Sequence, residues 1–212
     1  CGFHGGDPNT IIKTIELAIK YDVKIGAHPS FFDLEGFGRR KIDLELNELE
    51  SIILYQVSAL KGITESYGKK LHHVKPHGAL YNIASVNDDI AETIVLTIKK
   101  IDPNLKLYGP SKMKWKEISK KHKIEYVSEV FSDRNYNDNL TLVDRNNENS
   151  MITDIDNSIN HLSRMIENGK VKTINKKLID IDAETICIHG DQPNAHIFAK
   201  TIYNTFKSKI VK

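Results

Sequence analysis

Short apolar runs alternate with amphipathic stretches along almost the whole chain. The apolar runs are rich in β-branched residues and mostly end near Gly or Pro, which is typical of buried strands; they are VKIGAH (23–28), LHHVKPH (71–77), LKLYG (105–109), IEYVSEVF (124–131) and TICIHG (185–190). The amphipathic stretches have helix caps and helical periodicity; they span 9–21, 46–68, 87–101, 111–122, 153–169 and 194–210. Regular β-α alternation predicts parallel strands joined by crossover helices, and so an α/β fold, either a barrel or an open wound sheet.

The chain has the size and composition of one globular domain. It has 212 residues, 40% of them hydrophobic, which suffices for a sizeable core. Residues 170–182 predict a small hairpin before the last strand, and no linker, low-complexity tract or internal repeat is visible. We therefore expect a single domain over residues 1–212.

Charge and cysteine content exclude several classes of partner. The net charge of +2 is too small to indicate a nucleic-acid or membrane surface, and the Lys-rich stretch KMKWKEISKKHK has apolar residues at helical spacing. No apolar run approaches the roughly 20 residues that span a bilayer. Two cysteines cannot form a disulfide framework, and Cys187 lies in an apolar run, so a cytoplasmic protein is expected.

Polar residues follow the main strands where each one ends. In α/β folds this edge carries the active site, because the βα loops converge there. We therefore expect one shared catalytic pocket lined by His4, Asp7, His28, Lys75, His77, Asp133, Arg134, His189 and Asp191.

The stretch HVKPHGALYN (73–82) contains the densest group of these residues. Alternation along a strand places His73, Lys75 and His77 on one side, and Pro76 has no N–H, so the ladder should stop near Lys75. A partly desolvated lysine can bind an anionic substrate group, and imidazoles can transfer protons near neutral pH. At least one of the adjacent His72 and His73 is expected to be structural, since one must point away from the interior.

The loop DLEGFGRRKID (33–43) follows the His28 strand. Gly36 and Gly38 allow unusual dihedrals, while Arg39 and Arg40 offer forked donors to a carboxylate or phosphate. We expect an anion-binding lid here. The chain has no GxxxxGK[ST], GxGxxG, HExxH, CxxC or GxSxG motif, so ATP or NAD binding by a common motif is not indicated.

Six blocks of the sequence closely resemble, in order, the signature blocks of the LamB/YcsF family: CGFHGGDP, GAHPSFFDLEGFGRR, LYQVSAL, HVKPHGALYN, EVFSDRNY and CIHGDQPNA. The resemblance runs from the first residue almost to the last. It implies a (β/α) barrel related to the glycoside hydrolase/deacetylase barrels. It also implies the role of the A subunit in ATP-dependent opening of 5-oxo-L-proline to L-glutamate, together with partner subunits B and C.

The resemblance also carries expectations about the start of the chain and its cofactors. Family members usually begin with one more strand and an acid-rich block, which would precede Cys1, so we expect this barrel to lack the first strand. Those acids are expected to line the same pocket, so activity is expected of a version that includes them. ATP is expected as co-substrate, bound by the partner subunits, and whether a metal binds is left open.

Chemistry and resemblance together suggest roles. A general base must direct water at the lactam carbon, and His or Asp at strand ends would serve. The catalytic set is His4, Asp7, His28, Lys75, His77, Asp133, His189 and Asp191, with no metal ligand assigned. The substrate-binding set is Arg39, Arg40, Tyr81, Asn82 and Arg134.

Two other functions stay open. The first is a metal-dependent amide or carbohydrate deacetylase, in which His4, His28, His77 and His189 with Asp7 or Asp191 surround a divalent ion. The second is a non-catalytic subunit that binds 5-oxoproline and presents it to its partners.

Overall fold

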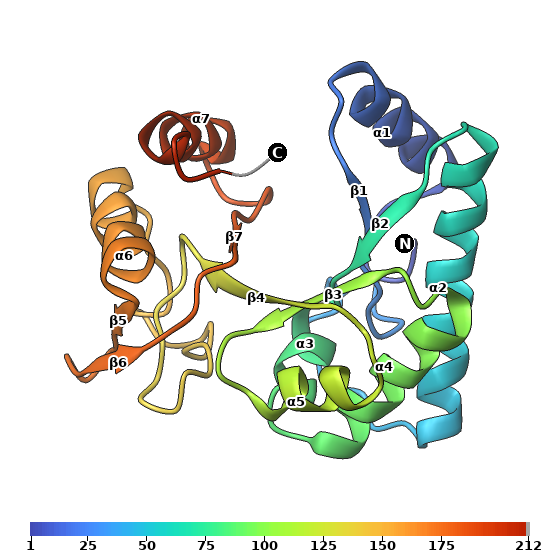
Figure 1. The fold of residues 1–212 in the computed structure, drawn as a ribbon, viewed down its shortest axis with the longest axis horizontal. Helices are drawn as coiled ribbons and strands as arrows, with labels where there is room; N and C mark the ends of the chain where they lie inside the picture. Colours follow the sequence, from blue (N-terminus) through green and yellow to red (C-terminus); the bar gives the residue numbers. More distant parts are fainter. Residues whose placement is uncertain (211–212) are drawn as a thin grey trace. The chain divides into compact units, whose positions relative to one another are not determined.

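The computed structural model describes residues 1–210 and has the predicted α/β class, in which helices and parallel strands alternate in a barrel-type order (Figure 1). In chain order the elements are α1 (Pro8–Lys20), β1 (Ile25–Ala27), α2 (Leu46–Ser66), β2 (Leu71–Val74), α3 (Gly78–Ala84), α4 (Asp88–Ile101), β3 (Lys106–Pro110), α5 (Lys114–Lys121), β4 (Tyr126–Phe131), α6 (Ile155–Asn168), β5 (Lys170–Lys172), β6 (Leu178–Asp180), β7 (Thr185–Cys187) and α7 (Ala195–Phe206). Every predicted strand and helix is present, although the bounds differ at the ends. None of the helices in this part of the chain has the length and apolarity that a bilayer crossing needs.

The chain divides into two compact units. The first comprises Cys1–Gly109 and Met113–Val127, and the second comprises Pro110–Lys112 and the chain from Ser128 onward. Each unit buries its own apolar side chains, such as Ile53 and Leu107 in the first and Val130 and Leu162 in the second. The expectation of a single domain stays a prediction.

In the first unit, β1, β2 and β3 are paired in parallel. Gly26 lies opposite His73 in the β1–β2 pair, and His73 lies opposite Lys106 in the β2–β3 pair. Val74 and Leu107, which are partners across β2 and β3, are fully buried. The strands are short, at three to five residues each, and they combine buried with half-buried residues.

Helix α2 covers this sheet and lies beside α4 (Figure 1). Its start is fixed by a capping box, in which Glu45 and Glu48 each accept a backbone N–H of the other. Leu49, Ile53 and Val57 recur at every fourth position and are buried, so one apolar stripe faces the sheet and α4. The same stripe carries Gln56, a buried polar side chain that contacts the loop after β1.

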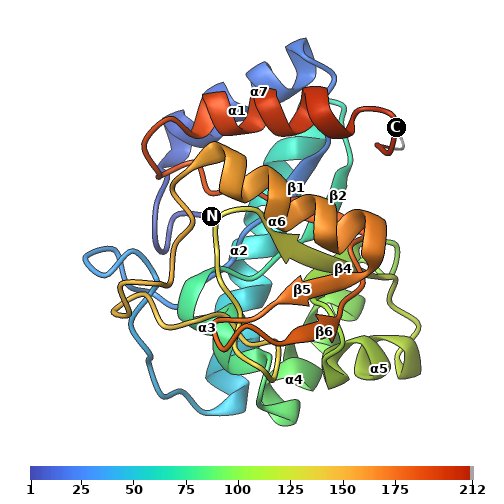
Figure 2. The same cartoon turned by 90° about the vertical axis from the view of Figure 1, so that its left-hand side faces the viewer.

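The second unit contains a parallel pair and an antiparallel hairpin. Strand β4 pairs with β7 in parallel, so that Phe131 lies opposite Cys187. The hairpin predicted over 170–182 is confirmed as β5 and β6, which lie against α6 (Figure 2). Helix α6 begins at the side-chain cap of Asp154 and ends at Gly169, which adopts the left-handed conformation with φ of 60°.

A buried histidine in α6 should make stability depend on pH. His161 is 6% exposed, and burial, followed by the nearby charge of Arg164, lowers its pKa from 6.5 to about 4. The unfolded chain therefore binds a proton that folded His161 does not, and the free energy of unfolding falls as the pH drops from 6.5 towards 4.

We expect His161→Phe to remove this contribution while keeping a planar ring beside Tyr136. Between pH 7 and pH 5, the wild type should lose about 2 kcal/mol of unfolding free energy more than the variant. Urea denaturation at both pH values measures this difference. Equal losses in the two proteins would contradict it.

Candidate functional site

The ends of β1 and β2 bring His28 and His77 together. The parallel pairing continues past both strands, because Lys75 N–H donates to the Ala27 carbonyl at 2.9 Å and His77 N–H donates to the Pro29 carbonyl at 2.8 Å. The sequence predicts that this ladder stops near Lys75 because Pro76 has no N–H, but the His77 N–H continues it by one more hydrogen bond, so that prediction is wrong. Polar residues at the ends of these neighbouring strands do meet, as expected of parallel strands.

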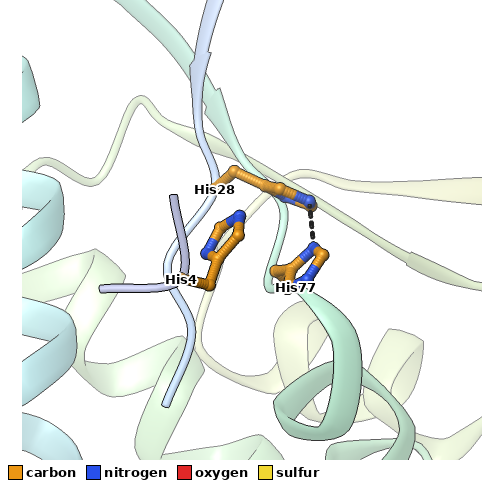
Figure 3. Close-up of side chains that lie close together, drawn as sticks. All are labelled: His4, His28 and His77. Atoms are coloured by element: carbon orange, nitrogen blue, oxygen red, sulfur yellow. Dashed lines mark hydrogen bonds between the residues drawn. The ribbon is translucent and has the colours of Figure 1, made fainter. Parts of the chain in front are cut away.

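Three imidazole rings form a cluster at this edge (Figure 3). His28 Nε2 lies 2.9 Å from His77 Nδ1, and the ring of His4 stacks on that of His77 with centroids 3.8 Å apart and planes at 4°. One ring nitrogen from each histidine lies within 4.8 Å of the other two. This group is the part of the described chain that could hold a metal ion.

Each ring is held by an oxygen on its far side. His28 Nδ1 lies 2.5 Å from the Lys75 carbonyl, and His77 Nε2 lies 2.7 Å from the Phe37 carbonyl. His4 Nδ1 lies 2.8 Å from Ser30 Oγ. These contacts fix the orientation of all three rings.

Burial and positive charge favour the neutral form of His4 and His28. Burial, followed by the charges of His77 and Arg39 among others, lowers the pKa of His4 to about 3. The pKa of His28 is lowered well below its usual value by burial, Lys75 and His77. The half-buried Lys75 and Arg39 therefore place positive charge beside the cluster, which favours an anionic ligand.

Asp33 organises the loop that supplies the Phe37 carbonyl. Its buried carboxylate accepts the Gly36 N–H at 2.9 Å and forms an ion pair with Arg40, whose Nε lies 2.9 Å away. The sequence pattern does not single out Asp33 as a site residue, although an Asp three residues before a Gly is a signal for such a turn. Ser30, which orients His4, has no comparable signal.

Gln56 of α2 fixes the loop after β1. Its Oε1 accepts the Ser30 N–H at 3.0 Å, and its Nε2 donates to the Ser30 carbonyl at 2.9 Å. This side chain lies in the block LYQVSAL that carries the family resemblance. The helix thus positions the serine that orients His4.

In the second unit, Asp133 and His189 form a pair. They follow β4 and β7, which are neighbouring parallel strands, and His189 Nδ1 lies 2.8 and 2.9 Å from the two carboxylate oxygens. Asp133 is fully buried, and the ring of Phe131 stacks on that of His189. A carboxylate at Nδ1 fixes the tautomer whose Nε2 accepts a proton, the arrangement of a general base.

Two predicted residues have evident structural contacts. Asp7 is exposed and caps α1, accepting the N–H groups of Asn9 and Thr10 at 2.9 and 3.1 Å. Arg40 is engaged by Asp33 and by Glu35 within its own loop. Neither observation tests their predicted roles at the site.

The remaining predicted residues lie outside the three-histidine cluster. Tyr81 and Asn82 are on α3, where Tyr81 is buried with its ring 5.9 Å from that of Trp115 and Asn82 is exposed. Arg134 is buried in the second unit and donates to the carbonyls of Val143 and Ser150, and Asp191 is exposed there.

The side chain of His73 packs against Tyr108 and Gly26 and is not part of the three-histidine cluster. Its ring stacks on that of Tyr108 with centroids 4.1 Å apart, and a Cβ on Gly26 would lie 2.2 Å from its Nε2. The ring therefore fills the space that the glycine leaves open. The expected convergence of the cluster with Asp133 and His189 on one pocket stays a prediction.

Comparison with known proteins gives consistent matches over the whole chain. The sequence model of the LamB/YcsF family matches residues 1–212. The 5-oxoprolinase A subunit from Bacillus cereus (strain 03BB102) is 44% identical over 208 residues, which cover 98% of this chain and 82% of that protein. The 5-oxoprolinase A subunit from Bacillus cytotoxicus is 43% identical over 207 residues, again 98% of this chain and 82% of the relative.

A solved structure matches the fold as well. The lactam utilization protein from Thermus thermophilus superimposes with a TM-score of 0.90 at 37% identity, covering 99% of this chain and 83% of that one. The sequence and structure comparisons thus agree over nearly the full chain.

A methyl group at Gly38 should disrupt the histidine cluster. Gly38 has φ of +67°, and a Cβ there would lie 2.9 Å from both His4 Cβ and His77 Cδ2. We expect Gly38→Ala to lower the free energy of unfolding by more than about 1 kcal/mol through backbone strain and crowding.

Gly62 provides the matched control. It is exposed in α2, and a Cβ there would meet nothing within 4 Å. Gly62→Ala should therefore stabilise the protein by roughly 0.5–1 kcal/mol in urea denaturation. A Gly38→Ala protein as stable as the Gly62→Ala protein would show that the loop is not packed as described.

Proposed function

Because this chain belongs to the LamB/YcsF family, we propose that it is the A subunit of a 5-oxoprolinase, which opens the lactam of 5-oxo-L-proline to give L-glutamate. The observation that carries the proposal is the buried histidine cluster at the ends of β1 and β2, with Lys75 and Arg39 beside it. Such a site suits a small substrate with a negative charge. The names of the relatives, which are 5-oxoprolinase A subunits and a lactam utilization protein, support the same chemistry.

We assign substrate binding to the positively charged side chains of Lys75 and Arg39. The carboxylate of 5-oxoproline is the anion that Lys75 and Arg39 would hold, and both side chains are half-buried, where screening by water is weaker. Arg39 also lies over the ring of Phe37, with its Cζ 5.1 Å from the ring centroid. That contact places its guanidinium near the loop whose carbonyl binds His77.

An unstrained lactam needs activation before it opens. We assign to ATP the phosphorylation of the lactam oxygen, which makes the ring carbon electrophilic. The chain has no phosphate-loop motif, so the nucleotide is assigned to partner subunits B and C.

Ring opening then requires a base and an acid. His189, oriented by Asp133, takes a proton from water as its oxygen bonds to the ring carbon. The C–N bond breaks, the ring nitrogen takes up a proton, and a second water releases inorganic phosphate. Protonated His189 would return that proton to the ring nitrogen, provided that it faces the bound substrate, as the strand-end rule predicts.

Reconstitution with partner subunits tests the proposed function. The chain alone should neither hydrolyse ATP nor open 5-oxoproline, whereas a version extended to the length of its relatives, mixed with subunits B and C, should do both. Coupled assays of ADP and glutamate release measure this. ATP-independent release of acetate from an acetylated amide or sugar would instead indicate a deacetylase.

Lys75→Met tests the anion-binding role because it keeps the apolar stem and removes the charge. We expect kcat/KM for 5-oxoproline in the reconstituted system to fall by a factor that corresponds to about 2–4 kcal/mol of transition-state stabilisation, with an unchanged melting temperature. Lys70→Met is the matched control, since Lys70 is exposed immediately before the start of β2. If Lys75→Met retains the wild-type kcat/KM, the role of this lysine is structural. If turnover is unchanged in both Lys75→Met and His189→Gln, the protein only binds the substrate.

A further inference from the structure

Hydrogen-bond donors and acceptors around His4 fix its tautomer. Ser30 Oγ donates its only proton to the Phe31 carbonyl at 2.8 Å, so it must accept from His4 Nδ1. His4 Nδ1 therefore carries the ring proton. In the neutral ring, His4 Nε2 is left as an unprotonated lone pair.

Two backbone carbonyls fix the other two rings in the same way. A carbonyl oxygen only accepts, so His28 Nδ1 must donate to Lys75 and His77 Nε2 must donate to Phe37. The neutral rings then have their lone pairs on His28 Nε2 and His77 Nδ1. These two nitrogens are the ones that lie 2.9 Å apart.

Two lone pairs at hydrogen-bond distance repel each other unless a cation lies at them. A proton shared between His28 Nε2 and His77 Nδ1 would remove only the repulsion between these two atoms. It would do nothing for the lone pair of His4 Nε2. All three rings instead share one pattern, in which one nitrogen is held by a protein oxygen and the other is directed towards the cluster. Outer oxygens that fix tautomers in this way are the usual second layer around metal-binding histidines.

We propose that His4, His28 and His77 bind a divalent first-row transition ion, with Zn²⁺ as the preferred occupant. Three neutral imidazoles suit such an ion and leave a fourth position for water or an anion. Lys75 and Arg39 add positive charge nearby, so an anion is the expected fourth ligand. The proposal is independent of the lactam reaction, because it rests on the ring contacts alone.

The cluster requires a limited rearrangement to bind the ion. Two ligands at about 2.05 Å and tetrahedral angles are about 3.3 Å apart, so His28 and His77 would separate slightly. His4 must move most, because its ring is parallel to that of His77. Lone pairs that lie in two parallel planes cannot point at the same ion. The His4 ring is therefore expected to tilt out of the stack.

Metal content provides a test that does not depend on activity. After chelator treatment and dialysis, the wild-type chain should bind one equivalent of Zn²⁺ with a Kd of about 1 µM or tighter by calorimetry. Co²⁺ should give visible d–d absorption bands that Zn²⁺ displaces. Absence of Zn²⁺ binding at about 100 µM metal would overturn the proposal, whatever the outcome of the lactam assays.

Variants locate the ion. His28→Gln and His77→Gln should each weaken Zn²⁺ binding at least about 100-fold, and Ser30→Ala, which removes only the oxygen behind His4, by roughly 10- to 100-fold. His196→Gln, an exposed histidine of α7, should bind as the wild type does. Circular dichroism confirms that each variant is folded, and the Co²⁺ bands of the wild-type chain provide a readout that needs no variant.

Cys1 provides the second control because its thiol lies near the cluster. Its Sγ accepts the His28 N–H at 3.2 Å, and a thiolate is itself a good Zn²⁺ ligand. Cys1→Ser should retain one equivalent of Zn²⁺. If Cys1→Ser abolishes Zn²⁺ binding while His77→Gln does not, the thiol of Cys1 binds the ion and the proposed three-histidine site is wrong.

Discussion

The parallel pairing of β1 and β2 beyond their ends is the contact on which the histidine cluster depends. Lys75 and His77 donate to the carbonyls of Ala27 and Pro29, and these bonds place His77 beside His28. The same extension turns the Lys75 carbonyl towards His28 Nδ1. One backbone arrangement therefore positions two rings and fixes the tautomer of one.

The loop after β1 adds the remaining constraints on the cluster. Asp33 closes the turn at Gly36, and Gly38 brings the backbone within reach of α3, where Ala79 N–H donates to the Gly38 carbonyl at 2.9 Å. A Cβ on Gly78 would lie 2.4 Å from that carbonyl, so two glycines permit this approach. The Phe37 carbonyl then meets His77 Nε2, which links the loop to the second strand end.

Periodicity and strand-end chemistry predicted much of this arrangement from sequence. The pairs His28 with His77 and Asp133 with His189 lie at the ends of neighbouring parallel strands, where the sequence placed them. Helix α3 escaped prediction because it is short and begins with Gly78 directly after a strand end. Asp33 and Ser30 act through hydrogen bonds of their side chains, and a hydrophobic pattern carries no information about which oxygen meets which ring nitrogen.

The two adjacent arginines differ in a way that the sequence could not distinguish. Arg40 is engaged by Asp33 and Glu35, so its charge is largely balanced within the loop. Arg39 lies over Phe37, and its charge contributes to the lowered pKa of His4. Positive charge beside a buried imidazole favours its neutral form, which is the form that binds a metal ion. The two proposals meet at this point, because the substrate carboxylate proposed for Lys75 and Arg39 would also be the anion proposed beside the metal ion.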